Sequence, residues 1–217
     1  MTPLFFKTPN GGFSLIELMV VLAISTMVSV IAIVGSSRFN GTVLLTNLAY
    51  EIAFSIREAQ SFGLNVREFQ PGTESATFNA GYGVHFFKDY SNGAPNTADY
   101  ITFADLVVSA GAGDFTYDGD ENGGPEFVAK YTTKKGNFIE KFCGIKSNNE
   151  EKCSNESGGL AYLDIVFLRP DPDATFTSNT GVLFRAAKIY VKSPQGGIKA
   201  VKVENTGQVT VCGAGGC

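Results

Sequence analysis

The sequence predicts an α+β protein in which one long N-terminal helix packs on a C-terminal antiparallel β-sheet domain, and three observations lead to this prediction. An apolar run covers residues 13–34 with a single charge, and an amphipathic stripe follows it. After Gly63, short runs rich in β-branched and aromatic residues alternate with clusters of Gly, Pro, Asn and Asp, a pattern typical of antiparallel sheets. We expect a transmembrane segment at 13–35, an amphipathic continuation of the helix at 36–63 and a β-rich globular domain at 64–217.

The apolar run has the length of a membrane span. At about 1.5 Å per residue its helix would extend roughly 33 Å, enough to cross a hydrocarbon core of about 30 Å. A cleaved secretory signal is the first alternative, but its apolar stretch has only about 7–15 residues. An ordinary signal anchor is the second, and it leaves Glu17 to reach the headgroups by snorkelling. Because an ionised side chain at bilayer depth costs roughly 2.5–3.5 kcal/mol, Glu17 indicates a function within the span.

The residues from Gly12 to Leu18 read GFSLIEL and resemble the class III signal of type IV pilins and type II secretion pseudopilins. That signal has a short hydrophilic leader ending in Gly, then Phe, then an apolar helix with Glu as fifth mature residue. Ser14 departs mildly from it, since Thr is commoner there. The resemblance implies a leader peptide at 1–12, cleavage by a prepilin peptidase between Gly12 and Phe13, and N-methylation of Phe13.

The resemblance also implies a structural subunit rather than an enzyme, either a minor pilin or a pseudopilin. Glu17 would guide filament assembly by neutralising the Phe13 ammonium of a neighbouring subunit, or that of its own chain, four residues away on one helix. The implied partners are other pilin or pseudopilin subunits, the prepilin peptidase, the inner-membrane assembly platform and membrane lipid. The chain would cross the inner membrane once with its C-terminal domain exported, and then enter a pilus or pseudopilus.

The second half of the helix carries an apolar stripe at spacings of three and four, made by Leu45, Leu48, Ile52, Ile56, Ala59 and Phe62. Gly63 and Asn65 indicate its end. Strands are predicted at Val66–Gln70, Tyr82–Lys88, Tyr100–Ala104, Phe127–Thr132, Phe138–Phe142, Tyr162–Leu168, Arg185–Lys192, Ala200–Glu204 and Val209–Cys212. Turns are indicated at 91–93, 135–137, 194–197 and 205–207, where Gly follows polar residues.

The globular part resembles the GspH/FimT group of minor pilins at 48–60, 81–86, 103–105 and 203–209. Some members of that group bind DNA through a basic motif directly after the glycine of the last hairpin. In this chain Gln208, Val209 and Thr210 follow Gly207, with no Arg. The formal net charge of −4 also disfavours binding to phosphates. Nucleic acid is therefore not an expected partner.

All four cysteines follow the anchor and would lie on the exported side, where disulfides form. Four cysteines allow three pairings. The simplest joins near neighbours, Cys143 with Cys153 and Cys212 with Cys217. A zinc site made by all four is the alternative, although their spacings do not fit a zinc ribbon.

An acidic loop offers an incomplete calcium motif. Asp118, Asp120 and Asn122 alternate before Gly123, like the first six positions of a calcium loop. The loop's twelfth position, where a bidentate Glu is needed, is Ala129, although Glu126 and Asp114 lie nearby. The other interpretation is a solvent-facing turn without a metal, so we expect no cofactor, with calcium as the alternative. A surface adhesin or ion-binding tip protein on a membrane anchor is the corresponding alternative function.

Two further features are interpreted as structural. The only His of the chain, His85, lies in a predicted strand, and without a second His or a nucleophile beside it we expect no catalytic triad. The segment Arg169–Asp173 contains two prolines, which end a strand, and it is expected to form a rigid turn.

Overall fold

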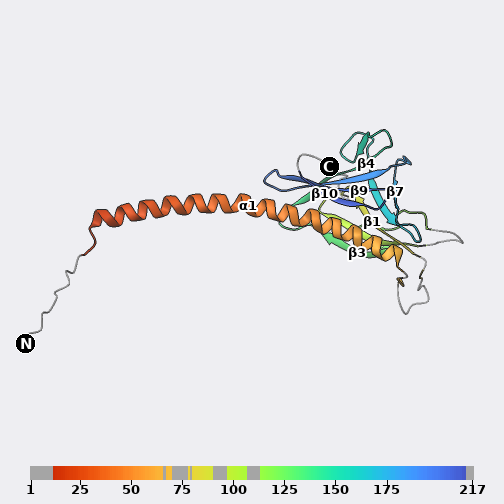
Figure 1. The fold of residues 1–217 in the computed structure, drawn as a ribbon, viewed down its shortest axis with the longest axis horizontal. Helices are drawn as coiled ribbons and strands as arrows, with labels where there is room; N and C mark the ends of the chain where they lie inside the picture. Colours follow the sequence, from red (N-terminus) through yellow and green to blue (C-terminus); the bar gives the residue numbers. More distant parts are fainter. Residues whose placement is uncertain are drawn as a thin grey trace, which may run out of the picture. The chain divides into compact units, whose positions relative to one another are not determined.

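A computed structural model describes residues 12–65, 67–69, 78, 80–89, 97–106 and 113–213, and for residues 34–40 it describes the backbone alone. The chain divides into two compact units, Met1–Asn40 and Gly41–Cys217. The single helix of the described residues, α1 (Leu15–Leu64), extends through both units (Figure 1). No proline interrupts it, so its backbone hydrogen bonds continue unbroken.

The end of α1 depends on a close approach of its backbone to the β domain. A Cβ atom added at Gly63 would lie 2.3 Å from the carbonyl oxygen of Phe167. Only glycine therefore fits where the last turn of α1 meets the strand that ends at Phe167. Asn65 then caps the helix, because its backbone N–H and its side-chain amide both donate to the carbonyl of Ser61.

The β domain contains two five-stranded antiparallel sheets. The first has the order β3-β2-β1-β6-β7. Its strands are β1 (Gly81–Phe87), β2 (Asp99–Asp105), β3 (Phe127–Thr132), β6 (Tyr162–Phe167) and β7 (Ala174–Ser178). The second has the order β10-β9-β8-β4-β5. Its strands are β4 (Phe138–Ile145), β5 (Glu151–Cys153), β8 (Ala186–Lys192), β9 (Ile198–Glu204) and β10 (Val209–Cys212).

One core joins residues 45–59 of α1 to both sheets. The helix contributes Leu45, Leu48, Ala49, Ile52, Ala53, Ile56 and Ala59, all buried. Each fully buried Leu or Ile stabilises the domain by about 1.5–3 kcal/mol relative to an exposed one. The amphipathic stripe expected from the sequence is therefore the face that holds α1 on the sheets.

The two sheets differ in how their outer faces are covered. In β8, Ala187, Ile189 and Val191 belong to the core. Lys188 and Lys192 on the same strand are half-buried, as in a strand with one face in the core and the other towards solvent. Every residue of β1 is buried, so both faces of the first sheet are covered. A second cluster occupies the outer face of that sheet and contains Phe87, Ile101, Phe103, Tyr117 and Val166.

The predicted α+β architecture is confirmed, with local differences. Eight of the nine predicted strands correspond to β1, β2, β3, β4, β6, β8, β9 and β10. Of the strand expected at Val66–Gln70, the structure describes residues 67–69, which form no strand beyond a single β-bridge residue at Phe69. The structure adds β5 and β7, and the prolines predicted to form a turn lie between β6 and β7. The turn indicated at 91–93 lies outside the described residues.

Candidate functional site

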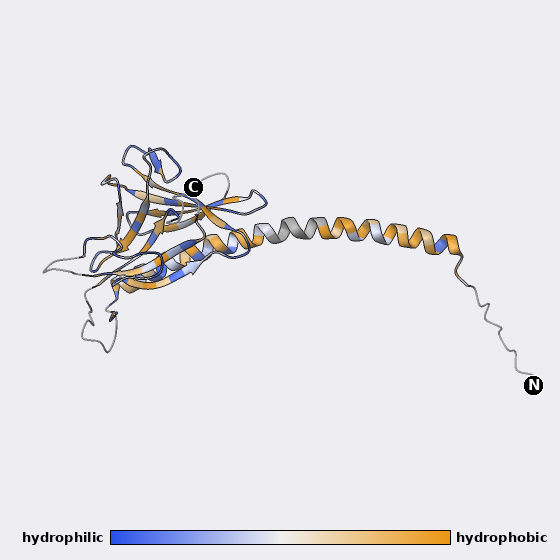
Figure 2. Ribbon diagram, turned by 180° about the vertical axis from the view of Figure 1, so that it is seen from behind, coloured by the Kyte–Doolittle hydropathy of each residue, from blue (hydrophilic) through white to orange (hydrophobic). Residues whose placement is uncertain are grey.

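The first half of α1 carries mostly apolar side chains, and these side chains are exposed. The segment Leu15–Ile33 has a mean hydropathy of 2.4, and by length and composition it is able to cross a membrane. Every residue from 12 to 33 is exposed, and this part of the helix is mostly apolar in Figure 2. Apolar patches of such extent are rare on soluble monomers. The segment therefore fits surroundings of lipid or of other apolar helices.

The hydroxyl groups in this segment are already satisfied by the helix itself. Ser25 donates to the carbonyl of Leu22 at 3.2 Å and Thr26 to that of Ala23 at 2.9 Å. Ser29 donates to the carbonyl of Ser25 at 2.7 Å. In hydrocarbon no water is available to replace these bonds, so polar side chains must find partners in the protein. The three residues consequently fit the apolar surroundings that the rest of the segment needs.

The Gly12–Phe13 bond lies just before the helix in an accessible stretch of chain. A Cβ atom added at Gly12 would meet nothing within 4 Å, so the fold itself does not require glycine there. Phe13 is 84% exposed. The first helical hydrogen bond runs from the N–H of Leu18 to the carbonyl of Ser14 at 3.1 Å. A requirement for Gly at this position must therefore come from something outside the folded chain.

Glu17 lies in the first turn of α1. Its carboxylate is exposed, and among the described residues it forms no ion pair. The N-terminal end of a helix favours negative charge, which makes this position locally favourable. The charge nevertheless sits among exposed apolar side chains such as Leu15 and Ile16. A cation placed at Phe13 would lie one helical turn away from it.

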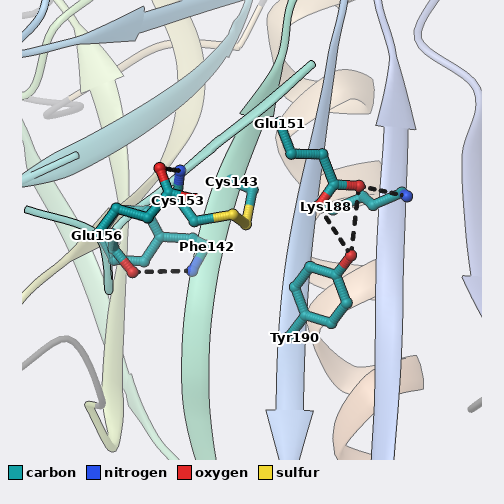
Figure 3. The surroundings of a disulfide bond; sticks show 8 residues. Phe142, Cys143, Glu151, Cys153, Glu156, Lys188 and Tyr190 are labelled. Carbon is teal, nitrogen blue, oxygen red and sulfur yellow. Dashed lines mark hydrogen bonds and ion pairs between the residues drawn. A yellow bond between two sulfur atoms is a disulfide. The ribbon is translucent and has the colours of Figure 1, made fainter. Parts of the chain in front are cut away.

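The disulfide predicted between Cys143 and Cys153 is present (Figure 3). The two residues face each other in the register of β4 and β5, with 4.0 Å between their Cα atoms. Cys143, Glu151 and Cys153 are the only group of three close metal-ligand side chains in the described part of the chain. Since both sulfurs are bonded to each other, the alternative of a four-cysteine zinc site is wrong. Cys217 lies outside the described residues, so its pairing with Cys212 stays a prediction.

The acidic loop does not gather its side chains around a common point. Asp118, Asp120 and Asn122 are exposed and belong to no group of three close metal-ligand side chains among the described residues. The Tyr117 hydroxyl donates to the carbonyls of Asp120 and Gly123, which fixes the turn from inside. The structure therefore gives calcium coordination at this loop no geometric support.

Glu126 belongs to a buried group of carboxylates that sequence reasoning missed. The other members, Asp105 and Asp164, are fully buried at the outer face of the first sheet. Glu126 accepts from the N–H groups of Leu106 at 2.7 Å and Asp118 at 2.8 Å. It is thus directed into the protein, where backbone N–H groups are its partners.

His85 and Asp164 form a buried pair, with 2.5 Å between Nδ1 and Oδ1. The imidazole also stacks on Phe87 at 5.4 Å between ring centres. Burial raises the pKa of Asp164. His85 and Asp164 are the single ionisable residues apart from Tyr in the largely apolar strands β1 and β6, and this sequence signal does not identify a partner. The buried position agrees with the structural role expected for His85.

Comparison with known protein families gives one match. Residues 7–33 match the prokaryotic N-terminal methylation motif, which covers the Gly12–Phe13 bond, Glu17 and the apolar part of α1. No curated protein and no solved structure matches the chain. The match therefore identifies the N-terminal segment and does not extend to the β domain.

Proposed function

We propose that this chain, a type IV pilin-like or pseudopilin-like precursor by its N-terminal methylation motif, becomes a structural subunit of a type IV pilus or a type II secretion pseudopilus. The observation that carries the proposal is the exposed apolar segment Leu15–Ile33, which begins directly after an accessible Gly–Phe bond and contains one carboxylate in its first turn. A simple anchor needs neither the accessible bond nor the carboxylate.

Processing begins with the leader, residues 1–12. A prepilin peptidase cleaves between Gly12 and Phe13 and methylates the new amine of Phe13. Glycine serves this step because a backbone without a side chain enters a protease cleft in extended form. Cleavage also creates a cation at Phe13, four residues before Glu17, which the precursor lacks.

Assembly follows from the same two charges. In the membrane the apolar half of α1 is surrounded by lipid, and in the filament it is surrounded by the helices of other subunits. Glu17 neutralises the Phe13 ammonium of a neighbour, so that neither charge remains unpaired in an apolar core. The inner-membrane assembly platform moves the subunit from lipid into the filament, and the β domain stays on the exported side.

As the finer assignment we propose a minor subunit of the GspH/FimT group, on the resemblance of the segments 48–60, 81–86, 103–105 and 203–209 to that group. The last hairpin of the β domain, β9 and β10, contacts α1 through Arg57, which donates to the carbonyl of Val209 at 3.1 Å. This hairpin contains the segment 203–209, in which the resemblance to that group lies. The proposed role of the chain is structural, as a filament subunit, and we propose no catalytic activity.

Intact-mass analysis and N-terminal sequencing of the protein extracted from its own host's membranes test the proposal. We expect a chain that starts at N-methylated Phe13. The variant Gly12→Leu should keep its leader, whereas the matched variant Gly11→Leu leaves the glycine at the cleaved bond and should be processed. A mature chain that starts at Met1, or one that starts near residue 37, would identify an ordinary anchor or a secretory signal instead.

A further inference from the structure

The segment 113–118, called the strap below, covers the outer face of the first sheet. Its Tyr117 is part of the cluster that contains Ile101, Phe103 and Val166. The ring centres of Tyr117 and Phe103 lie 5.4 Å apart. Ile101, Phe103 and Val166 have no exposed surface. Without the strap, an apolar and largely aromatic face of this sheet would be open to solvent.

Three carboxylates from outside the strap hold it in place. Its N–H groups donate to one carboxylate each: Phe115 to Asp105 at 3.2 Å, Tyr117 to Asp164 at 3.3 Å and Asp118 to Glu126 at 2.8 Å. All three acceptors are at most 2% exposed. A buried carboxylate is an expensive group unless each oxygen has a partner. The N–H bonds favour the ionised form of each acceptor, whereas burial and the neighbouring carboxylates favour the protonated form, and the attachment of the strap depends on which effect is larger at each group.

Asp105 is the member whose charge is least compensated. Its Oδ2 atom is buried and has no hydrogen-bond partner among the described residues. The groups that face it are Glu126, Asp114 and Asp164, and His85 forms its pair with Asp164. Residues 107–112, which follow β2, contain no ionisable side chain. Burial first, and then the charge of Glu126, raise the pKa of Asp105 to about 7.

The strap also holds its backbone in an uncommon conformation. Phe115 has a φ of 61°, the left-handed region that residues with a side chain rarely adopt. Beside it, Gly113 approaches Asp105 so closely that an added Cβ atom would overlap the carboxylate. The left-handed backbone of Phe115 is a strain that release of the strap would relieve.

We propose that the strap is a pH-sensitive cover of the aromatic face, closed while Asp105 is protonated and released as Asp105 ionises. The closed form keeps one proton on Asp105, so that an uncharged carboxyl lies beside Glu126. Loss of this proton places two carboxylates in one buried site. Opening exposes both to water and also exposes Phe103 and Tyr117.

The direction of the effect follows from the two protonation equilibria. The pKa of Asp105 is about 7 when the strap is closed and returns towards the ordinary value of about 3.9 when the strap is open. The closed form therefore binds more protons, and it loses stability as the pH rises between these two values. Above the upper value both forms are ionised and the effect levels off. Between pH 5 and pH 7 the open population should rise at least about tenfold.

Amide hydrogen exchange of the full-length chain in detergent micelles measures this opening. Protection factors, which correct for the pH dependence of the intrinsic exchange rate, are followed by NMR for Phe115 and Tyr117 from pH 5 to pH 8. We expect their protection to fall at least about tenfold between pH 5 and pH 7. Protection of Ile189, in the core of the second sheet, should not follow the same curve.

Two variants separate the proposed cause from general acid–base effects. Asp105→Asn has the same shape without the charge, and it should keep the strap protected at pH 7 and flatten the curve. Asp120→Asn removes an exposed carboxylate near the strap and should leave the wild-type curve unchanged. Equal pH dependence in wild type and Asp105→Asn would overturn the proposal. So would a fall in the protection of Ile189 in parallel with Phe115, since that would indicate global unfolding.

Discussion

The hydroxyl groups of Ser55 on α1 and Tyr100 on β2 lie 3.0 Å apart inside the core. Ser55 also donates to the carbonyl of Glu51, one turn earlier on the helix. Burial raises the pKa of Tyr100, so its hydroxyl remains protonated and available for the bond. This is a direct polar link between the helix and the first sheet within an otherwise apolar interface. We expect Tyr100→Phe to lower the free energy of unfolding by about 1 kcal/mol, measured by urea denaturation.

Tyr82 supplies the matched control for this substitution. Its hydroxyl is also buried, but it has no hydrogen-bond partner among the described residues. Removal of an unpaired buried hydroxyl removes an unfavourable group. Tyr82→Phe should therefore leave the stability unchanged or raise it. Equal losses in the two variants would show that the bond between Tyr100 and Ser55 contributes nothing beyond the general effect of removing a buried hydroxyl.

The sequence was sufficient for features that are encoded locally. The apolar run, the stripe on α1 and most strands follow from residue spacings within one element, and glycines mark the turns at Gly136, Gly196 and Gly207, where φ is positive. The missed strands β5 and β7 are short and rich in polar residues. Their extended form depends on pairing with β4 and β6 more than on their own residues.

The buried carboxylates could not be predicted because sequence-distant segments create their environment. Asp105 and Asp164 belong to β2 and β6, which flank β1 in the same sheet, and Glu126 comes from the segment that precedes β3. In the sequence each one reads as an ordinary polar residue. Only the strand order and the strap that covers this face place them together in a buried site.

The disulfide between Cys143 and Cys153 should stabilise the β domain mainly through the unfolded chain. The two residues are 10 apart in the sequence, and closing such a loop is worth about 2–3 kcal/mol in the chain-entropy treatment. The double variant Cys143→Ala/Cys153→Ala should lose roughly that much free energy of unfolding in urea. The loss is expected to leave the fold intact, because Phe142 and Ser154 also bond across these strands.

A reductant provides the control for the disulfide. Dithiothreitol should destabilise the wild-type chain by more than it destabilises the double variant. The remaining effect on the double variant reports any bond between Cys212 and Cys217, which mass mapping after alkylation without reductant detects independently. Wild type and double variant with equal denaturation midpoints under oxidising conditions would contradict the stabilising role of the bond between Cys143 and Cys153.

Gly207 in the last hairpin should tolerate no side chain. Its φ is +78°, and an added Cβ atom would lie 2.4 Å from Nε2 of Gln60 and 2.5 Å from the carbonyl oxygen of Pro172. Gln60 donates to the carbonyls of both Gly207 and Pro172, so the clash would disturb a contact between α1 and two loops. We expect Gly207→Ala to cost about 2–3 kcal/mol in thermal or urea unfolding, from strain and lost contacts together.

The substitution Gly196→Ala separates the cost of backbone strain from the cost of lost contacts. Its φ is +86°, but an added Cβ atom there would meet nothing within 4 Å. Gly196→Ala should therefore cost only the backbone strain, about 1–2 kcal/mol. If both substitutions had the same effect, the contact of Gly207 with α1 would contribute nothing measurable.

Glu17 offers the most direct test of assembly, because its substitution should separate processing from incorporation. Glu17→Ala leaves the Gly12–Phe13 bond accessible, so the chain should still mature to N-methylated Phe13. In the filament the variant would leave the Phe13 ammonium unpaired among apolar helices, which costs several kcal/mol when one partner of a buried pair is removed. Incorporation into filaments, measured by immunoblot of sheared fractions against membrane fractions, should fall at least about tenfold.

Glu51→Gln removes an exposed carboxylate from the second half of the same helix and should incorporate normally. Normal incorporation of Glu17→Ala would show that the carboxylate is not needed for assembly and that the apolar surface alone drives it.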